Sequence, residues 1–399
     1  MSEGRILTTH TGSLVRPREL LELVPTVDRE DGGDAAAYER ALEQAVGDVV
    51  RRQVEAGIDV IDDGEMGKAN WITYLYERVT GIEPRLVPVD VGELLPPSRD
   101  RLAFPEFYAE HDAAYLREVL NRARSDGSTV EVKRWFCTGP IGYDAAALER
   151  DIERFRRALD GVEVADAFLP VVAPASVYWL HNEHYPSEED FVFAVADALS
   201  EEYRRIVDAG FLLQVDDAVL MHEYDSILAG GGSVDDYRRW AELRVDALNH
   251  ALEGIPEERI RYHVCFGSWH GPHAYDPPLA DVIDLVLRVR ARYYLMEQAN
   301  PRHEHEWRLW EAVELPEGKV LVPGVVTHHT TVVEHPELVA ERLVRLARLV
   351  GPERVMGGTD CGFAQSAFVQ RVHPSVQWAK LASLAEGARI ASERLSSRA

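Results

Sequence analysis

The chain has 399 residues, of which 46% are apolar and 28% charged, a globular composition that excludes collagen-like, low-complexity and largely disordered proteins. The 43 Lys and Arg against 68 Asp and Glu give a formal net charge of −25, which argues against nucleic acid and anionic membrane surfaces as partners because both are bound by clustered cations. Three cysteines are an odd number and cannot all pair in a disulfide framework, so a reducing compartment is favoured.

No stretch of the chain approaches the ~18–20 apolar residues of a membrane span, and the first residues lack the apolar run of a signal peptide. We therefore expect a soluble, cytoplasmic protein without a membrane partner. Assembly into a homo-oligomer is compatible with these features.

In chain order, short β-rich runs alternate with longer amphipathic stretches. The expected strands are 6–9, 59–62, 133–137, 168–172, 212–215, 261–265, 293–297, 320–326 and 354–356. The expected helices, with apolar residues at three- and four-residue spacing, are 35–56, 188–209, 234–252, 336–350 and 375–392. This alternation predicts a parallel sheet with helical crossovers.

The predicted fold is an α/β (β/α)8 TIM barrel formed by one domain over residues 1–399, with an inserted loop or subdomain. Nine strand candidates exceed the eight of such a barrel, so at least one of them lies outside it or is wrong. The insertion is placed at about 83–127, where the chain is rich in proline and lacks clean periodicity.

An internal similarity points to two acids. Gly57 and Gly210 each follow a helix that ends in a similar sequence, and each is expected to adopt the left-handed conformation that ends a helix. Asp63 and Asp216 each follow six residues later, at the end of a predicted strand. Active sites of barrels are built at the carboxyl ends of their strands. The alternative is an ordinary αβ repeat with incidental acids.

Four metal-binding side chains stand at the ends of three other predicted strands. His263 and Cys265 are two residues apart, so both point to one face of a strand. Cys361 follows another strand, and Glu297 ends an apolar run. Together they form a plausible N, S and O ligand set for zinc. The alternative is that the cysteines are buried free thiols that behave as small apolar residues.

A zinc ion held by two thiolates suits the binding of a third sulfur. Binding of a substrate thiol to the metal lowers its pKa, so a nucleophilic thiolate exists near neutral pH. The ligand set therefore favours alkyl transfer to a thiol over metal-assisted hydrolysis, which commonly uses ligands rich in histidine or carboxylate.

The same motifs resemble the catalytic half of cobalamin-independent methionine synthases and their relatives, which include epoxyalkane:coenzyme M transferase. The matching motifs follow one another along nearly the whole chain. They are Thr8-Thr9-His10-Thr11-Gly12-Ser13-Leu14, Asp63-Gly64-Glu65, Gln214-Val215-Asp216, His263-Val264-Cys265, Glu297 and Asp360-Cys361-Gly362.

The resemblance implies a role for each matching residue. His263, Cys265, Glu297 and Cys361 would bind zinc, and Thr11, Gly12 and Ser13 would contact an amino-acid substrate. Glu65 and Asp216 would hold the ammonium group of homocysteine, and two carboxylates suit that task because they form charge-assisted hydrogen bonds. Asp63 and Asp217 would be neighbours that support the site or face solvent.

His329 matches the residue that donates a proton to the departing group in the synthases. It stands in Thr327-His328-His329-Thr330-Thr331, where that family has D-I-H-S-P. Asp216 is the second residue expected in the catalytic machinery.

We therefore predict a zinc-dependent methyltransferase that transfers a methyl or alkyl group to a small thiol, with homocysteine giving methionine as the leading case. The alternative acceptor is coenzyme M, whose sulfonate would need a cationic anchor such as Arg16, Arg18 or Lys68. Two further alternatives are a metal-free or non-catalytic barrel and a decarboxylase of the uroporphyrinogen type. The decarboxylase would need basic residues to hold several carboxylates.

Overall fold

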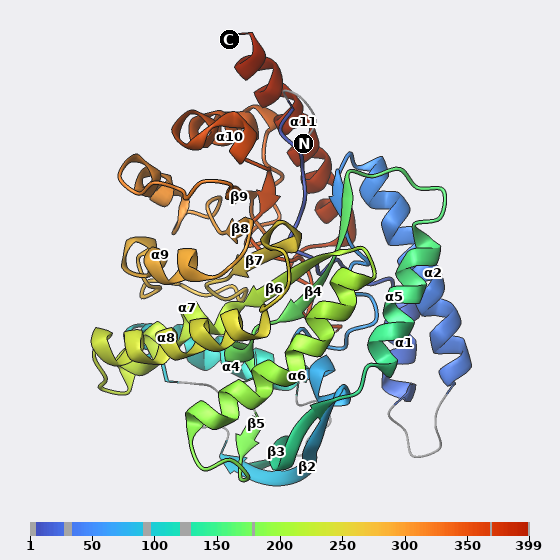
Figure 1. The fold of residues 1–399 in the computed structure, drawn as a ribbon, viewed down its shortest axis with the longest axis vertical. Helices are drawn as coiled ribbons and strands as arrows, with labels where there is room; N and C mark the ends of the chain where they lie inside the picture. Colours follow the sequence, from blue (N-terminus) through green and yellow to red (C-terminus); the bar gives the residue numbers. More distant parts are fainter. Residues whose placement is uncertain are drawn as a thin grey trace.

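The computed structural model describes residues 5–27, 34–90, 97–119, 129–177, 180–367 and 369–397. Its centre is a curled parallel sheet of seven strands, with helices around the outside (Figure 1). The strand order is β1-β4-β6-β7-β8-β9-β10. The strands are β1 (Val60–Ile61), β4 (Asp166–Val172), β6 (Leu212–Asp217), β7 (Ile260–Val264), β8 (Tyr293–Met296), β9 (Val320–Val326) and β10 (Gly358–Thr359).

The N-terminal segment closes this sheet into a barrel. Thr8 pairs in parallel with Gly357, and the Thr9 amide donates to the Gly357 carbonyl at 2.8 Å. On its other side, the Thr8 carbonyl accepts hydrogen bonds from the amides of Asp59 and Val60 at 3.1 and 3.0 Å. The segment therefore lies between β10 and β1 as an eighth strand, which confirms the predicted (β/α)8 fold.

The ninth strand candidate, 133–137, lies outside the barrel. It belongs to β3 (Thr129–Tyr143), which pairs antiparallel with β2 (Val79–Asp90) and parallel with β5 (Leu180–Asn182) in a separate three-stranded sheet. Helices α3 (Arg99–Ala103) and α4 (Pro105–Val119) stand between β2 and β3 in the chain. The predicted insertion at about 83–127 falls within this excursion, although its residues 91–96 and 120–127 lie outside the described residues. The single-domain organisation stays a prediction.

The five predicted helices are present, with ends that differ from the prediction by at most four residues. Gly57 and Gly210 have φ values of 85° and 96°, so both end a helix in the left-handed region as expected. The helices outside the sheet are α1 (Arg18–Val27), α2 (Ala35–Glu55), α5 (Ala146–Ala158), α6 (Glu188–Asp208), α7 (Ala218–Ala229), α8 (Val234–Ala251), α9 (Leu279–Arg288), α10 (Pro336–Val350) and α11 (Pro374–Ser396).

The barrel strands are largely buried because they are covered on both faces, and β6 and β7 carry buried polar side chains among their apolar ones. Every residue of β7 and of β9 is buried. Polar side chains that follow the strands therefore gather at one rim of the barrel, where the carboxyl ends of parallel strands meet.

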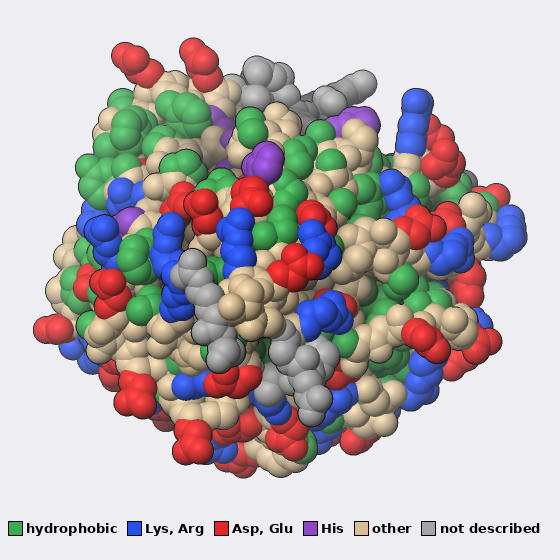
Figure 2. Space-filling model, turned by 90° about the horizontal axis from the view of Figure 1, so that it is seen from above, with side chains coloured by type: hydrophobic (Ala, Val, Ile, Leu, Met, Phe, Trp, Pro, Cys, Tyr) green, Lys and Arg blue, Asp and Glu red, His purple; other side chains and the backbone are tan. Residues whose placement is uncertain are grey.

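The surface view in Figure 2 shows acidic and basic side chains intermixed on the face that it presents, without a large field of either sign. Among the described residues, no helix combines the length and the apolar character needed to cross a bilayer.

Candidate metal centre and active site

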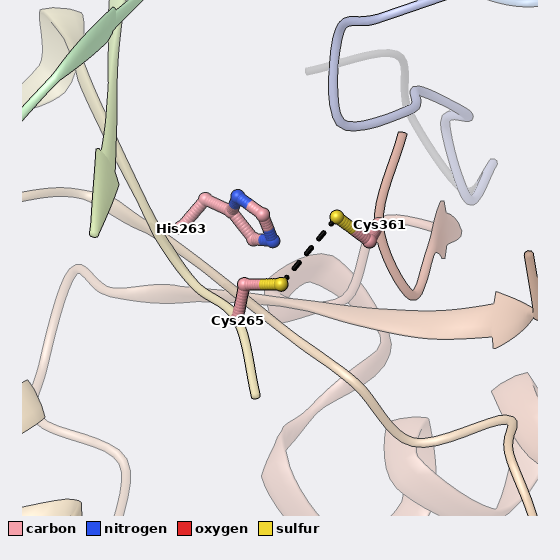
Figure 3. Close-up of side chains that lie close together, drawn as sticks. All are labelled: His263, Cys265 and Cys361. Atoms are coloured by element: carbon pink, nitrogen blue, oxygen red, sulfur yellow. Dashed lines mark hydrogen bonds between the residues drawn. The ribbon is translucent and has the colours of Figure 1, made fainter. Parts of the chain in front are cut away.

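The structure brings together three of the four predicted metal ligands. The ligand atoms of His263, Cys265 and Cys361 all lie within 4.8 Å of one another, and all three residues are buried. The two sulfur atoms are 3.5 Å apart. Figure 3 shows the imidazole of His263 and the thiol of Cys265 directed toward Cys361, which comes from a different part of the barrel. This cluster could hold a metal ion.

The local backbone explains how these side chains meet. His263 lies in β7 and Cys265 follows the end of that strand, so both project to the same side. Cys361 begins the loop after β10, and its neighbour Gly362 lies against the N-terminal turn. A Cβ atom at Gly362 would stand 2.0 Å from Ser13 Oγ, so only glycine permits this approach.

The donor atoms suit a metal ion. The pKa of Cys361 is lowered to about 6, chiefly by the hydrogen bond from Cys265 and further by the nearby His263, while burial opposes the shift. The Nε2 atom of His263 is buried and has no hydrogen-bond partner among the described residues. The buried nitrogen and the two sulfur atoms, one of which ionises readily, together form a donor set that suits a thiophilic metal.

The carboxylate of Glu297 lies outside the compact cluster. Its Oε1 atom accepts a hydrogen bond from the Phe266 amide at 3.1 Å, and Oε2 accepts one from Asn300 Nδ2 at 2.8 Å. His329 Nε2 is 3.7 Å from the same Oε2. Glu297 is thus held by neighbouring donors in this conformation, and its role as a ligand stays a prediction.

A cavity of about 290 Å³ opens beside the cluster. Its wall includes the three cluster residues, four of the predicted substrate contacts, and side chains from α3, α4, α7 and the loop after β7. The residues that line it include Thr11, Ser13, Glu65, Tyr108, Asp216, His222, His263, Cys265, Trp269 and Cys361.

The two acids predicted to hold an ammonium group both line this cavity. Burial raises the pKa of Glu65 to about 7, and the nearby charge of Asp216 adds to the rise while Lys68 opposes it. Asp216 Oδ1 accepts hydrogen bonds from His263 at 2.9 Å and from Gln214 at 3.0 Å. A cation in the cavity would relieve the repulsion between these two carboxyl groups.

The neighbouring acids, Asp63 and Asp217, are buried and accept hydrogen bonds from backbone amides. Asp63 accepts a hydrogen bond from the Glu65 amide at 2.9 Å, and Asp217 caps the start of α7 through the Leu220 amide. Tyr262 also donates to Asp217. Asp63 therefore holds the loop that carries Glu65, and Asp217 holds the end of β6 beside Asp216. This agrees with the expectation that these two acids support the site.

The predicted substrate turn lies against Glu65. Thr11 and Ser13 line the cavity, and the Thr11 hydroxyl lies 3.1 Å from the carbonyl of Thr359 in β10. Gly12 has a φ of 130°, and a Cβ atom there would stand 2.8 Å from Glu65 Oε1. Glycine at this position therefore lets the turn approach the carboxyl group.

His329, the predicted proton donor, is not among the residues that line the cavity. Its ring stands next to His328 and His273, with centroids 4.0 and 5.2 Å away. The imidazole of His222 does line the cavity, against Trp269. The role of His329 stays a prediction.

The three cations considered as sulfonate anchors are directed elsewhere. The guanidinium of Arg16 donates to the carbonyls of Ala364, Glu65 and Lys68, and the ammonium of Lys68 donates to the carbonyl of Pro170. Arg18 is exposed and pairs with Glu22. None of the three is among the cavity-lining residues.

Several cavity-lining residues, including those of α3, α4 and α7, were not predicted from the sequence, and neither was a role for the nearby Gln214. Helices α3 and α4 contribute Tyr108 and its neighbours to the wall, although their stretch shows no periodicity that predicts a helix. Arg99 fastens α3 to Asp225 of α7 with an ion pair of 2.5 Å. Gln214 was part of a recognised motif without a role, and it contacts both Thr11 and Asp216.

Comparison with known proteins gives relatives along nearly the whole chain. No protein-family model matches. A methionine synthase from Sulfolobus acidocaldarius is 24% identical over 97% of this chain and 93% of its own length. A methionine synthase from Thermococcus kodakarensis is 22% identical over 97% and 94%, respectively. A 2-hydroxypropyl-CoM lyase from Xanthobacter autotrophicus is 23% identical over 89% and 86%.

Solved structures share the fold. A B12-independent methionine synthase from Shewanella, in complex with selenomethionine, superposes with a TM-score of 0.71 at 19% identity and covers 98% of this chain and 99% of its own. A putative vitamin-B12 independent methionine synthase from Listeria monocytogenes gives 0.65 at 18% identity, over 96% and 98%. The resemblance predicted from the motifs is thus confirmed: the chain is similar over nearly its full length to methionine synthases and to a 2-hydroxypropyl-CoM lyase, and it has the barrel fold of B12-independent methionine synthases.

Proposed function

We propose that the protein is a zinc-dependent methyltransferase that transfers a methyl or alkyl group to the sulfur of a small thiol, with homocysteine as acceptor and methionine as product. The observation that carries this proposal is the buried His263, Cys265 and Cys361 cluster in the wall of the same cavity as Glu65 and Asp216. The names of the relatives support the methyl transfer and the acceptor.

The chain's own residues supply binding and orientation. His263, Cys265 and Cys361 would hold the zinc, with Glu297 as a further ligand. Zinc bound there would lower the pKa of a thiol that binds to it, so that the thiolate would be available near neutral pH. Glu65 and Asp216 fix the ammonium group of the amino acid, and the Thr11–Ser13 turn closes that side of the cavity.

The reaction forms a bond between the acceptor sulfur and the donor's methyl carbon, and breaks the bond between that carbon and the leaving group. The electron pair of the broken bond stays with the leaving group, which takes up a proton so that it does not depart as an unstable anion. This proton balances the one that the thiol loses when it becomes a thiolate. We assign this proton to His329, as the resemblance implies.

We also propose a cytoplasmic location. The three cysteines are free in this structure, and two of them would serve as thiolate ligands, which a reducing compartment preserves.

Metal analysis of the purified protein tests the zinc site. We expect about one equivalent of zinc in the wild-type protein and less than about half in Cys265→Ser and Cys361→Ser. Cys137→Ser is the matched control, because Cys137 is also buried but donates its thiol hydrogen to the Gly139 carbonyl away from the cluster. A wild-type protein without zinc, or serine variants that keep it, would favour the non-catalytic barrel.

The acceptor is tested on cobalt-substituted protein. Homocysteine should add a sulfur-to-metal charge-transfer band and bind more tightly than coenzyme M, because the carboxyl groups of Glu65 and Asp216 in the cavity favour an ammonium group over a sulfonate. Two arginines also line the cavity, but Arg101 pairs with Asp112, and Arg371 contacts Gln365 and Ser268. Glu65→Gln should raise the KM for homocysteine but leave binding of a thiol without an amino group unchanged. If coenzyme M is the better ligand, the homocysteine assignment is wrong.

A further inference from the structure

A buried chain of hydrogen bonds leads from the interior of the barrel to the metal cluster. It begins at Arg261, which is 1% exposed, and passes through Gln214, which is fully buried. The distances are 3.0 Å from Arg261 Nε to Gln214 Oε1, 3.0 Å from Gln214 Nε2 to Asp216 Oδ1, and 2.9 Å from Asp216 Oδ1 to His263 Nδ1.

The first contact fixes the orientation of the Gln214 amide. A guanidinium group can only donate hydrogen bonds, so the atom that faces Arg261 Nε must be the amide oxygen. The other donors of Arg261 are held by the hydroxyl of Thr9 and the carbonyl of His10, at 2.9 and 2.8 Å. The guanidinium also lies over the ring of Phe168, 3.7 Å from its centroid. Arg261 is therefore held in one position.

The amide nitrogen of Gln214 then has two acceptors. One is the carbonyl of Thr11, in the predicted substrate turn, and the other is Asp216 Oδ1. The reverse orientation of the amide would place its oxygen against a carbonyl and a carboxylate, and its nitrogen against a guanidinium. Three contacts thus exclude that orientation.

The direction of the hydrogen bond between Asp216 and His263 can now be assigned. An ionised carboxylate can only accept, so the hydrogen between Asp216 and His263 resides on Nδ1. In the neutral ring, Nε2 then presents a lone pair, and Nε2 is the buried atom beside the two sulfur atoms that no described donor or acceptor reaches. Outer hydrogen bonds of this kind orient metal-binding histidines and set their tautomer.

We infer that Gln214 and Arg261 are positioning residues, which set the His263 tautomer through Asp216 and hold the Thr11–Ser13 turn in register with the metal cluster. This inference rests on the proposed function, since it assigns Nε2 to the metal. Gln214 is the residue where the two tasks meet, because its single amide nitrogen contacts both the turn and Asp216.

Two variants of Gln214 test the inference. Glu at this position accepts from Arg261 but cannot donate to Thr11 or Asp216, and Met removes both functions without adding charge. We expect zinc affinity, measured by competition with a chelator, to fall about 10- to 100-fold in Gln214→Glu and Gln214→Met. Zinc affinity within about twofold of the wild type in both folded variants would overturn the inference.

Gln377→Glu is the matched control. Gln377 is also fully buried, and its Oε1 accepts a hydrogen bond from the Val15 amide at 2.7 Å, but its Nε2 has no partner in the described part of the chain. The exchange therefore buries a carboxylate without removing a donated hydrogen bond. We expect its zinc affinity to match the wild type. An equal loss in Gln377→Glu would show that buried charge, rather than the lost donor, weakens the site, and would contradict the inference.

A direct readout does not depend on activity or on zinc. Nitrogen-15 NMR of histidine-labelled, metal-free protein should show a slowly exchanging hydrogen on His263 Nδ1, and this exchange should become faster in Gln214→Met. A ring with its hydrogen on Nε2 alone would overturn the inference even if zinc binds. A protein with the Nδ1 hydrogen but no affinity for zinc would contradict the proposed function instead, so the two failures are distinguishable.

Discussion

Gly12 shows how closely the N-terminal turn approaches the predicted ammonium site. Its φ of 130° and the 2.8 Å that would separate an added Cβ atom from Glu65 Oε1 restrict the position to glycine. The sequence identified the turn by its motif. It did not reveal that the Glu65 carboxyl group lies close to the turn, because Gly12 and Glu65 are 53 residues apart in the chain.

The first prediction concerns Gly12→Ala. We expect it to lower the free energy of unfolding by more than about 1 kcal/mol, since alanine is strained at this φ, and to raise the KM for the acceptor about tenfold by displacing Glu65. The control is Gly161→Ala, where φ is also positive, at 73°, but no described atom lies within 4 Å of the new Cβ. Urea unfolding should show a loss of about 1 kcal/mol in the control, with an unchanged KM. Equal KM values in the two variants would contradict the predicted contact.

The cluster of His263, Cys265 and Cys361 illustrates what spacing can predict at the scale of residues. His263 and Cys265 share a strand, so their common direction follows from the two-residue period. Cys361 joins them because parallel strands end at one rim, as the sequence also indicated. Glu297 ends a strand in the same way, yet its carboxylate is held by Phe266 and Asn300, and no sequence pattern reports such local hydrogen bonds.

At the scale of elements, α11 is fastened to the loop after β9 by a buried ion pair. Lys380 of α11 is fully buried, and its ammonium group lies 2.9 and 3.1 Å from the two carboxylate oxygens of Glu334. Glu334 also accepts a hydrogen bond from the Thr327 amide at 2.9 Å. The loop between Thr327 and Glu334 carries His328 and His329, so this pair holds their backbone.

The second prediction is that Lys380→Met lowers the free energy of unfolding by about 3–5 kcal/mol, because it leaves the Glu334 carboxylate buried without its partner. Arg389→Met on the same helix is the control. Arg389 is exposed and pairs with Glu386 and Glu393 at the surface, so its loss should change stability by less than about 1 kcal/mol. Urea denaturation of both variants measures the difference. Similar losses in the free energy of unfolding for the two variants would mean that burial adds nothing to the contribution of the Lys380–Glu334 ion pair.

The helices show which elements the periodicity of apolar residues can predict and which it cannot. Five long amphipathic stretches were predicted and found, and Asp34, Ser187 and Ser233 cap the first turns of α2, α6 and α8. Helices α1, α3, α4, α5, α7 and α9 were not predicted. For α3 and α4, the packing that stabilises them comes from elsewhere in the chain. Asp100 of α3, for example, accepts a hydrogen bond from the Ala274 amide.

At the scale of the whole molecule, the segment at Thr8 and Thr9 joins the first and last strands of the sheet. Its backbone hydrogen bonds reach Gly357 on one side and Asp59 and Val60 on the other. The Asp59 carboxylate also accepts from the Thr8 amide and hydroxyl, at 2.9 and 3.0 Å. Closure leaves no free edge between β1 and β10.

The third prediction is that Thr9→Pro destabilises the whole barrel. It removes the amide that donates to Gly357, and one buried carbonyl without a donor costs about 1–3 kcal/mol, to which the steric conflict of the ring adds. The same change at Leu86, which is 68% exposed in β2 of the outer sheet, should have a smaller effect on the melting temperature. A larger effect at Leu86 would show that the outer sheet, rather than barrel closure, limits stability.

The sequence by itself determined the alternation of strands and helices, the excess of one strand candidate, the order of the motifs and the pairing of His263 with Cys265, because each depends on local periodicity or on fixed spacing. Only the tertiary structure decided that 133–137 leaves the barrel, that α3 and α4 wall the cavity, and that Glu297 stands apart from the cluster. It also decided the path from Arg261 through Gln214 to His263. These features depend on contacts between residues distant in the chain, and such contacts arise only when the barrel closes.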